Sequence, residues 1–123
     1  MTERFTLPGG GQACVLQRPE TPSTDRRVLI LVHSPPFDDR GSEPLLHLAA
    51  SLNFATVRID LTGCGESPGA TRFFSHERDA DDLAACVRHL REERCLEVAG
   101  IVGLGGGGTA YADLRLEPLA DEL

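Results

Sequence analysis

Three short apolar segments separated by helix-like stretches constrain this chain more than any other feature. They span residues 27–32 (Arg-Val-Leu-Ile-Leu-Val), 55–61 and 97–104. Each has the length and the β-branched content of a strand that is buried on both faces. Strands of this kind alternate with helices in α/β proteins, where right-handed crossovers join parallel neighbours. The pattern therefore predicts an α/β fold built around a parallel sheet.

The segments between and before these strands complete the expected fold. Two short alternating segments, 4–7 and 13–17, flank a glycine-rich turn and predict an N-terminal hairpin. Helices are expected after Ser42 and after Ser75, where apolar side chains recur at helical spacing. We therefore expect a mostly parallel sheet of about five strands, with an N-terminal hairpin and helices on both faces.

Composition narrows the classes of function. A chain of 123 residues suits a single domain, and we expect 1–123 to form one. Its net charge of −7 argues against a nucleic-acid partner, because phosphate backbones repel an acidic surface. The sequence shows no Cys-x-x-Cys pair, no secretory signal and no apolar run of membrane-spanning length. We therefore expect a cytoplasmic protein without membrane contact, cofactor or metal site.

Several motifs carry a family resemblance. Segment 28–33 runs from an apolar strand into a histidine turn, and segment 58–69 contains Asp-x-x-Gly-x-Gly-Glu-Ser-x-Gly, the most specific motif of the chain. Together with the order of the elements, these motifs resemble the α/β-hydrolase superfamily. The likeness is greatest to its small esterase and serine-aminopeptidase-like members, including cinnamoyl-esterase-like enzymes. It runs from about Val28 to Ala112 and implies the N-terminal part of the fold, that is, a truncated domain.

The nucleophile position is where the chain departs from this family. Family members carry Gly-x-Ser-x-Gly on a sharp turn between a strand and a helix. The corresponding stretch here is Gly103-Leu104-Gly105-Gly106-Gly107, so Gly105 stands where the serine is expected and offers no atom to activate. The family also places an acid and then a histidine after the serine, and no histidine follows Gly105. The resemblance implies a carboxylic-ester or peptide hydrolase, but its Ser-Asp-His triad is not present in this chain.

The oxyanion hole implied by the resemblance is also incomplete. One backbone N–H donor is expected from the segment that contains Ser34 and Pro35, and the other from Gly106. Proline has no N–H, so Pro35 at the donor position would remove one of the two donors. Loss of one such donor typically lowers the rate by about 10²–10³-fold.

Two side chains of the loop after the second apolar segment are candidate substitutes for the nucleophile. Ser67 lies in segment 65–69, which matches Gly-x-Ser-x-Gly literally, although Pro68 opposes an immediate helix start. Cys64 is a thiol in the same glycine-rich loop, without a base at a recognisable spacing. We favour a loop position outside the nucleophile turn for Ser67 and a spectator thiol for Cys64.

Three functional hypotheses follow. The first is a catalytically inactive α/β-hydrolase-like fragment or pseudoenzyme that binds a partner. The second is an active esterase-like serine hydrolase that another chain completes or that uses an unforeseen nucleophile. The third is an anion- or nucleotide-binding module, because the loop from Gly103 to Gly108 matches Gly-x-Gly-x-x-Gly after a strand. The third needs a further strand ending in an acidic residue about 20 positions later, and the sequence ends first.

The last apolar segment also predicts an interaction. A strand from Glu97 to Leu104 that is apolar on both faces would lie at the edge of the sheet. Unpaired backbone groups and apolar area at such an edge favour a cover. We expect this cover to be a protein partner, a second copy in a homo-oligomer, or the C-terminal segment of the chain itself.

Overall fold

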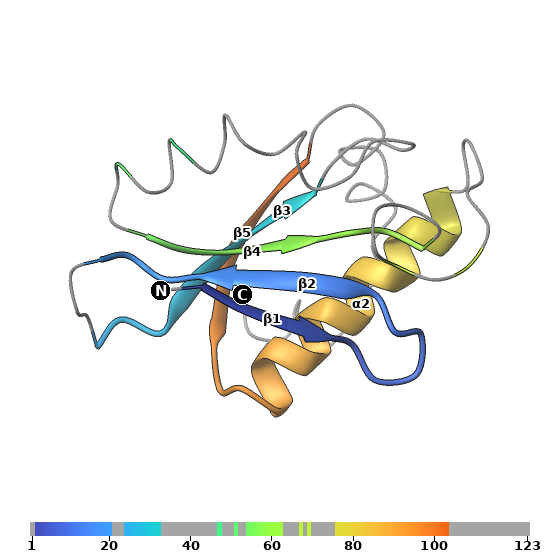
Figure 1. The fold of residues 1–123 in the computed structure, drawn as a ribbon, viewed down its shortest axis with the longest axis horizontal. Helices are drawn as coiled ribbons and strands as arrows, with labels where there is room; N and C mark the ends of the chain where they lie inside the picture. Colours follow the sequence, from blue (N-terminus) through green and yellow to red (C-terminus); the bar gives the residue numbers. More distant parts are fainter. Residues whose placement is uncertain are drawn as a thin grey trace.

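One five-stranded mixed sheet organises the chain (Figure 1). The computed structural model describes residues 2–20, 24–32, 47, 51, 54–62, 67, 69 and 76–103. Their elements are β1 (Thr2–Thr6), β2 (Ala13–Gln17), β3 (Arg27–Val32), β4 (Ala55–Ile59), α2 (His76–Glu92) and β5 (Glu97–Gly103). The strand order is β1-β2-β4-β3-β5, which confirms the expected α/β class with an N-terminal hairpin.

The pairing of β3 defines the parallel part of the sheet. β3 pairs in parallel with β4 on one side and with β5 on the other. β2 pairs antiparallel with both β1 and β4, so among the described strands only β2 runs against the rest. The last residues of β3, β4 and β5, which are Val32, Ile59 and Gly103, therefore lie toward the same end of the sheet. We term it the carboxyl end.

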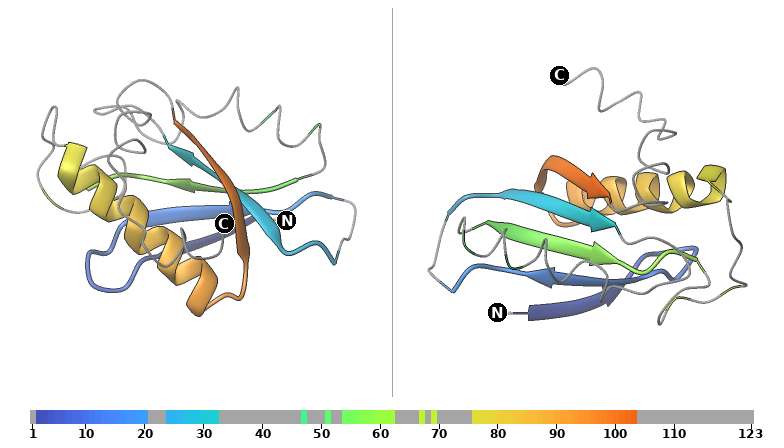
Figure 2. Two further views of the ribbon diagram at one scale, coloured as in Figure 1. Left: turned by 180° about the vertical axis from the view of Figure 1, so that it is seen from behind. Right: turned by 90° about the horizontal axis from the view of Figure 1, so that it is seen from above.

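Helix α2 forms because its apolar residues recur every three or four positions. Leu83, Val87 and Leu90 are fully buried on the side of the helix that packs against the sheet. Figure 2 shows the helix lying across one face of the strands. Beyond the helix, Cys95 takes a left-handed backbone conformation, with φ of 54°, and the N–H of Leu96 donates to the Leu90 carbonyl at 2.9 Å. This reversal leads the chain directly into β5.

The hydrophobic core lies between α2 and the sheet. Its strand residues alternate along β3 and β4, as the two-residue period of a strand requires. They are fully buried: Val28, Ile30, Val32, Val57 and Ile59. Burying a side chain of this size contributes about 1.5–3 kcal/mol each, so this layer fixes the positions of the strand ends that carry the candidate site.

The remaining expectations are met in part. The helix expected after Ser75 is α2, whereas the helix expected after Ser42 lies outside the described residues except for His47 and Ser51. Within the ranges given above, no helix is both long and apolar enough to cross a bilayer.

Candidate functional site

The carboxyl end of the sheet is the place where an α/β fold of this topology holds ligands. The chain leaves β3 for β4 on one side and reaches β5 on the other, so the strand connections reverse direction at β3. Ligand sites of α/β sheets lie outside the carboxyl ends of the strands at such a switch point. Val32 and Gly103 are direct partners across β3 and β5, so these two strands end at neighbouring points.

Most of the candidate site residues lie outside the described part of the chain. Of the glycine loop 103–108, only Gly103 is described. The structure describes one of the two substitute nucleophiles, Ser67. The candidates that fall outside are Ser34, Pro35, Cys64, Gly105 and Gly106.

Ser67 is held by two backbone groups. Its side chain is buried, and its Oγ donates to the Asp60 carbonyl oxygen at 2.5 Å and accepts from the Ala13 N–H at 2.8 Å. The Asp60 N–H in turn donates to the Ala13 carbonyl at 2.9 Å. A nucleophilic serine gives its proton to a general base. In this structure the Ser67 hydroxyl donates its proton to a backbone carbonyl oxygen. Its two hydrogen bonds connect the residue after β4 to the start of β2.

Gln12, Thr62 and Asp82 form a polar cluster. Its member Thr62 lies shortly before Ser67 in the sequence. The Asp82 carboxylate accepts from Gln12 Nε2 at 2.9 Å, from the Thr62 N–H at 2.7 Å, and from Thr62 Oγ at 2.7 Å. Gln12 Nε2 also lies 3.1 Å from Thr62 Oγ. This Gln12–Thr62–Asp82 cluster joins the hairpin, the residue after β4 and helix α2, three elements that are distant in sequence.

The surroundings of the Gln12–Thr62–Asp82 cluster leave it little freedom. Asp82 is 5% exposed and Gln12 is 6% exposed. A Cβ atom at Gly10 would lie 2.3 Å from Gln12 Nε2, so a side chain there would displace the Gln12 amide from its place in the cluster. Arg78 Nη2 donates to the Thr62 carbonyl at 3.2 Å from the first turn of α2. The cluster therefore holds the start of the loop that carries Ser67.

Sequence reasoning did not find this cluster. The sequence places Asp79, Asp81 and Asp82 near the start of a helix, where negative charge suits the helix dipole. The structure separates them: Asp79 and Asp82 are buried, whereas Asp81 is exposed. The available signal was the helical spacing, since Asp79 and Asp82 lie on the same face as the buried Leu83 and Cys86.

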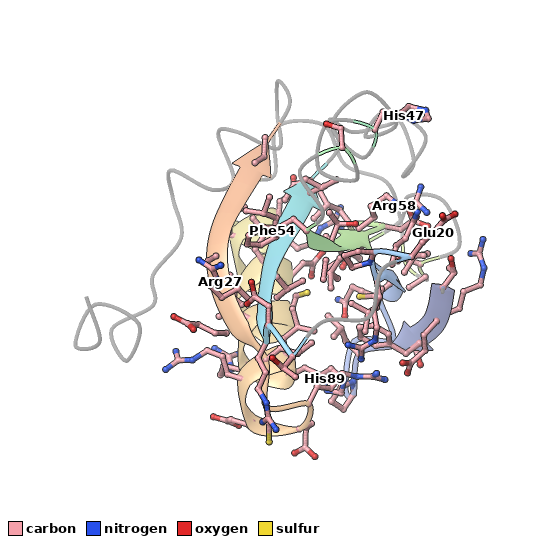
Figure 3. The ribbon with its side chains drawn as sticks, turned by 90° about the vertical axis from the view of Figure 1, so that its left-hand side faces the viewer. Glu20, Arg27, His47, Phe54, Arg58 and His89 are labelled. Carbon is pink, nitrogen blue, oxygen red and sulfur yellow. The ribbon has the colours of Figure 1, made fainter. Side chains whose placement is uncertain are left out.

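His89 lies at the opposite end of the molecule from the carboxyl end. Its ring stacks on Phe5 with 5.3 Å between centroids, and its Nε2 accepts from Arg94 Nε at 3.2 Å. Arg94 also lies 4.0 Å over the Phe5 ring and pairs with Glu3. Figure 3 shows His89 at the end of the sheet away from the tips of β3 and β5. His89 joins β1 to the end of α2, far from the position where a base would be needed.

The described cysteines are free thiols in two environments. Cys14 on β2 and Cys86 on α2 are buried, and Cys95 is exposed. A hydrogen bond with the Cys86 side chain, followed by burial, raises the pKa of the Cys14 thiol far above its ordinary value. Among the described residues, no group of His, Cys, Asp or Glu side chains is arranged to hold a metal ion.

Comparison with solved structures identifies the fold. An alpha-beta serine hydrolase homologue from Coxiella burnetii superposes with a TM-score of 0.74 over 92% of this chain, at 20% identity. Est1E from Butyrivibrio proteoclasticus, solved with ferulic acid bound, superposes with a TM-score of 0.76 over 89% of this chain, at 17% identity. The lidless a/b serine hydrolase XC6422 from Xanthomonas campestris superposes with a TM-score of 0.68 over 98% of this chain, at 22% identity. The chain has an α/β-hydrolase fold.

The shared part of the α/β-hydrolase fold is about half of each relative. This chain covers 55% of the Coxiella protein, 45% of Est1E and 57% of XC6422. No family model matches the sequence. A search of curated proteins finds no match either. The likeness of this α/β-hydrolase fold to known proteins therefore lies in the arrangement of its strands and helix.

Proposed function

We propose that this chain is a non-catalytic α/β-hydrolase-like domain that acts by binding a protein partner. The observation that carries the proposal is the bonding of Ser67, the described serine that matches the nucleophile motif. Its hydroxyl donates to the Asp60 carbonyl and accepts from the Ala13 N–H. Attack on an ester would require Ser67 to leave both backbone groups, and the Asp60 carbonyl would lose this partner.

The sequence supports the same conclusion at the expected nucleophile position. Gly105 follows β5 with only Leu104 between, and it brings no hydroxyl or thiol to the carboxyl end. His89, the histidine whose contacts are described, lies at the other end of the sheet. A triad needs a nucleophile, a base and an orienting acid within hydrogen-bond reach of one another.

The partner surface is strand β5. Glu97 and Ala99 are exposed, and Val98, Ile101 and Val102 are half-buried, although the strand is almost entirely apolar. By contrast, β3 is buried at four of its six positions. Strands that leave apolar area and backbone groups at a sheet edge are the usual sites of strand addition.

An esterase assay tests the non-catalytic part of the proposal. The purified chain and its Ser67→Ala variant are compared for turnover of p-nitrophenyl acetate and for covalent labelling by a fluorophosphonate. We expect turnover no faster than buffer and no label on either protein. Turnover or labelling of the wild-type chain that Ser67→Ala abolishes, while the variant stays folded by circular dichroism, would establish an active serine hydrolase and overturn the proposal.

A variant that places a hydroxyl at position 105 tests whether only the nucleophile is missing or the base as well. Gly105→Ser places a serine at the family position without adding a base or an acid. We expect Gly105→Ser to remain as slow as the wild type, because an unactivated serine is a weak nucleophile. A Gly105→Ser protein that hydrolyses the ester would show that a base is already in place.

A further inference from the structure

Two buried thiols, those of Cys14 and Cys86, meet in the core between β2 and α2. Cys14 and Leu16 alternate along β2, so both side chains point to the side of the sheet that α2 covers. Cys86 lies on the buried face of α2, between Leu83 and Leu90. The side chains of Cys14 and Cys86 are hydrogen-bond partners, and they are 1% and 0% exposed. Two sulfur atoms from segments far apart in the sequence therefore lie in contact.

A second contact between the same two segments holds the thiols in register. Gln12 precedes Cys14 by two residues, and Asp82 precedes Cys86 by about one helical turn. Gln12 Nε2 donates to the Asp82 carboxylate at 2.9 Å, and that carboxylate also accepts from Thr62. Figure 1 shows α2 crossing behind β2. The thiol pair and this hydrogen bond therefore lie side by side across one interface.

A pair of cysteines in contact has a chemistry that a single core cysteine lacks. One buried cysteine fills space as a small apolar side chain. A disulfide forms only between side chains that point at each other, and most cysteine pairs fail this requirement. Cys14 and Cys86 meet it, because their thiols are hydrogen-bonded within the folded chain. The exposed Cys95 lies beyond the end of α2 and belongs to no such pair among the residues that the structure describes.

We propose that Cys14 and Cys86 are an oxidation site, at which hydrogen peroxide forms a disulfide that locks α2 onto β2 and a thiol reductant removes it. One sulfur, as the thiolate, attacks peroxide and breaks the O–O bond. It becomes a sulfenic acid, and the released hydroxide takes up that thiol's proton as water. The second sulfur loses its proton and displaces hydroxide from the sulfenic acid, which forms the S–S bond and a second water. Two thiols are thereby oxidised, and one peroxide is reduced to two waters.

Burial determines how fast this site reacts. The hydrogen bond with Cys86, and then burial, raise the pKa of Cys14 far above its ordinary value, so Cys14 rests as a protonated thiol. Its thiol also donates to the Gln12 carbonyl at 3.8 Å. Peroxide reaches the pair only when α2 and β2 open locally, whereas Cys95 is exposed at all times. We therefore expect the pair to oxidise more slowly than Cys95 and to respond to sustained exposure.

Peptide mapping without reduction tests the pairing in the wild-type chain. One sample is exposed to hydrogen peroxide in buffer and another in concentrated urea, and the linked peptides are quantified by mass spectrometry. In the folded chain we expect the Cys14–Cys86 link to exceed the Cys86–Cys95 link by about tenfold or more. In urea the order should reverse, because the shorter loop closes more readily. The same ratio in both samples, or no Cys14–Cys86 link in folded protein whose Cys95 is fully oxidised, would overturn the proposal.

Matched cysteine variants test whether the link acts as a lock. Oxidised wild-type protein should unfold at a urea midpoint about 1 M or more above the reduced form, because the cross-link restricts the unfolded chain. Dithiothreitol should return the midpoint to the reduced value. Cys95→Ala keeps the pair and should show the same shift, whereas Cys14→Ala should show none.

Two outcomes of this comparison contradict the lock. The first is a linked wild-type protein whose midpoint does not rise or does not return on reduction. The second is an equal rise in Cys14→Ala, which would assign the stabilisation to another group. If Cys14→Ala does not fold, the ratio of links in the folded and unfolded wild-type chain still decides the proposal. Neither measurement involves ester turnover or a protein partner, so its result is independent of the proposed function.

Discussion

The hydroxyl of Ser67 donates a hydrogen bond to the carbonyl oxygen of Asp60, the residue that follows β4. The same oxygen atom of Ser67 accepts from the Ala13 N–H at the start of β2. One buried side chain therefore connects the loop after β4 to the N-terminal hairpin. Its role in this structure is to hold two backbone segments together.

Replacing Ser67 by alanine should destabilise the fold. The Asp60 carbonyl and the Ala13 N–H would each lose a partner, and a buried polar group left unpaired costs about 1–3 kcal/mol. Urea unfolding followed by circular dichroism measures this loss. Thr24→Ala is the control, since Thr24 is exposed and an exposed substitution of this kind changes stability by about 0.5 kcal/mol or less. Equal midpoints for the two variants would contradict the role assigned to Ser67.

Adjacent aspartates on α2 should respond very differently to the same substitution. Asp82→Ala removes the acceptor of Gln12 Nε2 and of both Thr62 donors, whereas Asp81 is exposed. We expect Asp82→Ala to lower the free energy of unfolding by about 1–3 kcal/mol or more, because buried donors lose a charged partner. Asp81→Ala, which removes a negative charge from the neighbouring position of the same helix, should cost about 0.5 kcal/mol or less. Chemical denaturation of the two variants provides the comparison.

The ion pair between Asp25 and Arg27 makes the stability of the fold depend on pH, and the direction of that dependence follows from the pKa of Asp25. Hydrogen bonds from the Arg27 side chain, and then from its backbone N–H, lower the pKa of Asp25 from 3.8 to about 2. Because the folded value is the lower one, the stabilisation is fully present above pH 3.8 and is lost as the pH falls toward 2.

Nuclear magnetic resonance of the Asp25 carboxyl carbon tests this directly. The titration midpoint should lie near 2 in the wild type and should return toward 3.8 in Arg27→Gln. Both groups are exposed, so added salt should raise the wild-type midpoint by screening the pair. An unchanged midpoint in Arg27→Gln would show that the Arg27 side chain is not the cause.

Thiol alkylation should discriminate sharply among the described cysteines. Thiolate is the reactive form, and the hydrogen bond with Cys86 together with burial raises the pKa of Cys14. We expect iodoacetamide to modify the exposed Cys95 in the native protein, and to modify Cys14 and Cys86 only after unfolding in urea. Peptide mapping by mass spectrometry gives the order. Native modification of Cys14 at the rate of Cys95 would contradict the buried placement.

Strands whose pattern is local were predictable from sequence. β2 and β3 begin and end at the residues expected, because an apolar run is bounded by proline, glycine or charge. β1 was expected to begin at Arg4 but begins at Thr2, where it pairs with Gln17 across the hairpin. That boundary depends on the length of the partner strand, which the local alternation of β1 does not contain.

The candidate site was predictable only where a motif marks it. The motif after β4 correctly drew attention to Ser67, but its two backbone partners come from the fold and not from the motif. The link between Gln12 and Asp82 joins residues 70 positions apart. Helical periodicity places Asp82 on a face, but only the docking of α2 on the sheet brings that face to the hairpin turn.

The strand order also determines when each strand can pair during translation. The β1–β2 hairpin leaves the ribosome first, yet its docking strand is β4, so it must wait until residue 59 has been made. β3 emerges before either of its neighbours and gains the second one only when residue 103 is complete. Pairings between such distant segments form slowly, because a long loop must close before any contact is gained. The nascent chain therefore leaves one side of β3 unpaired until residue 103 has been made, and this interval is when we expect a chaperone to hold it.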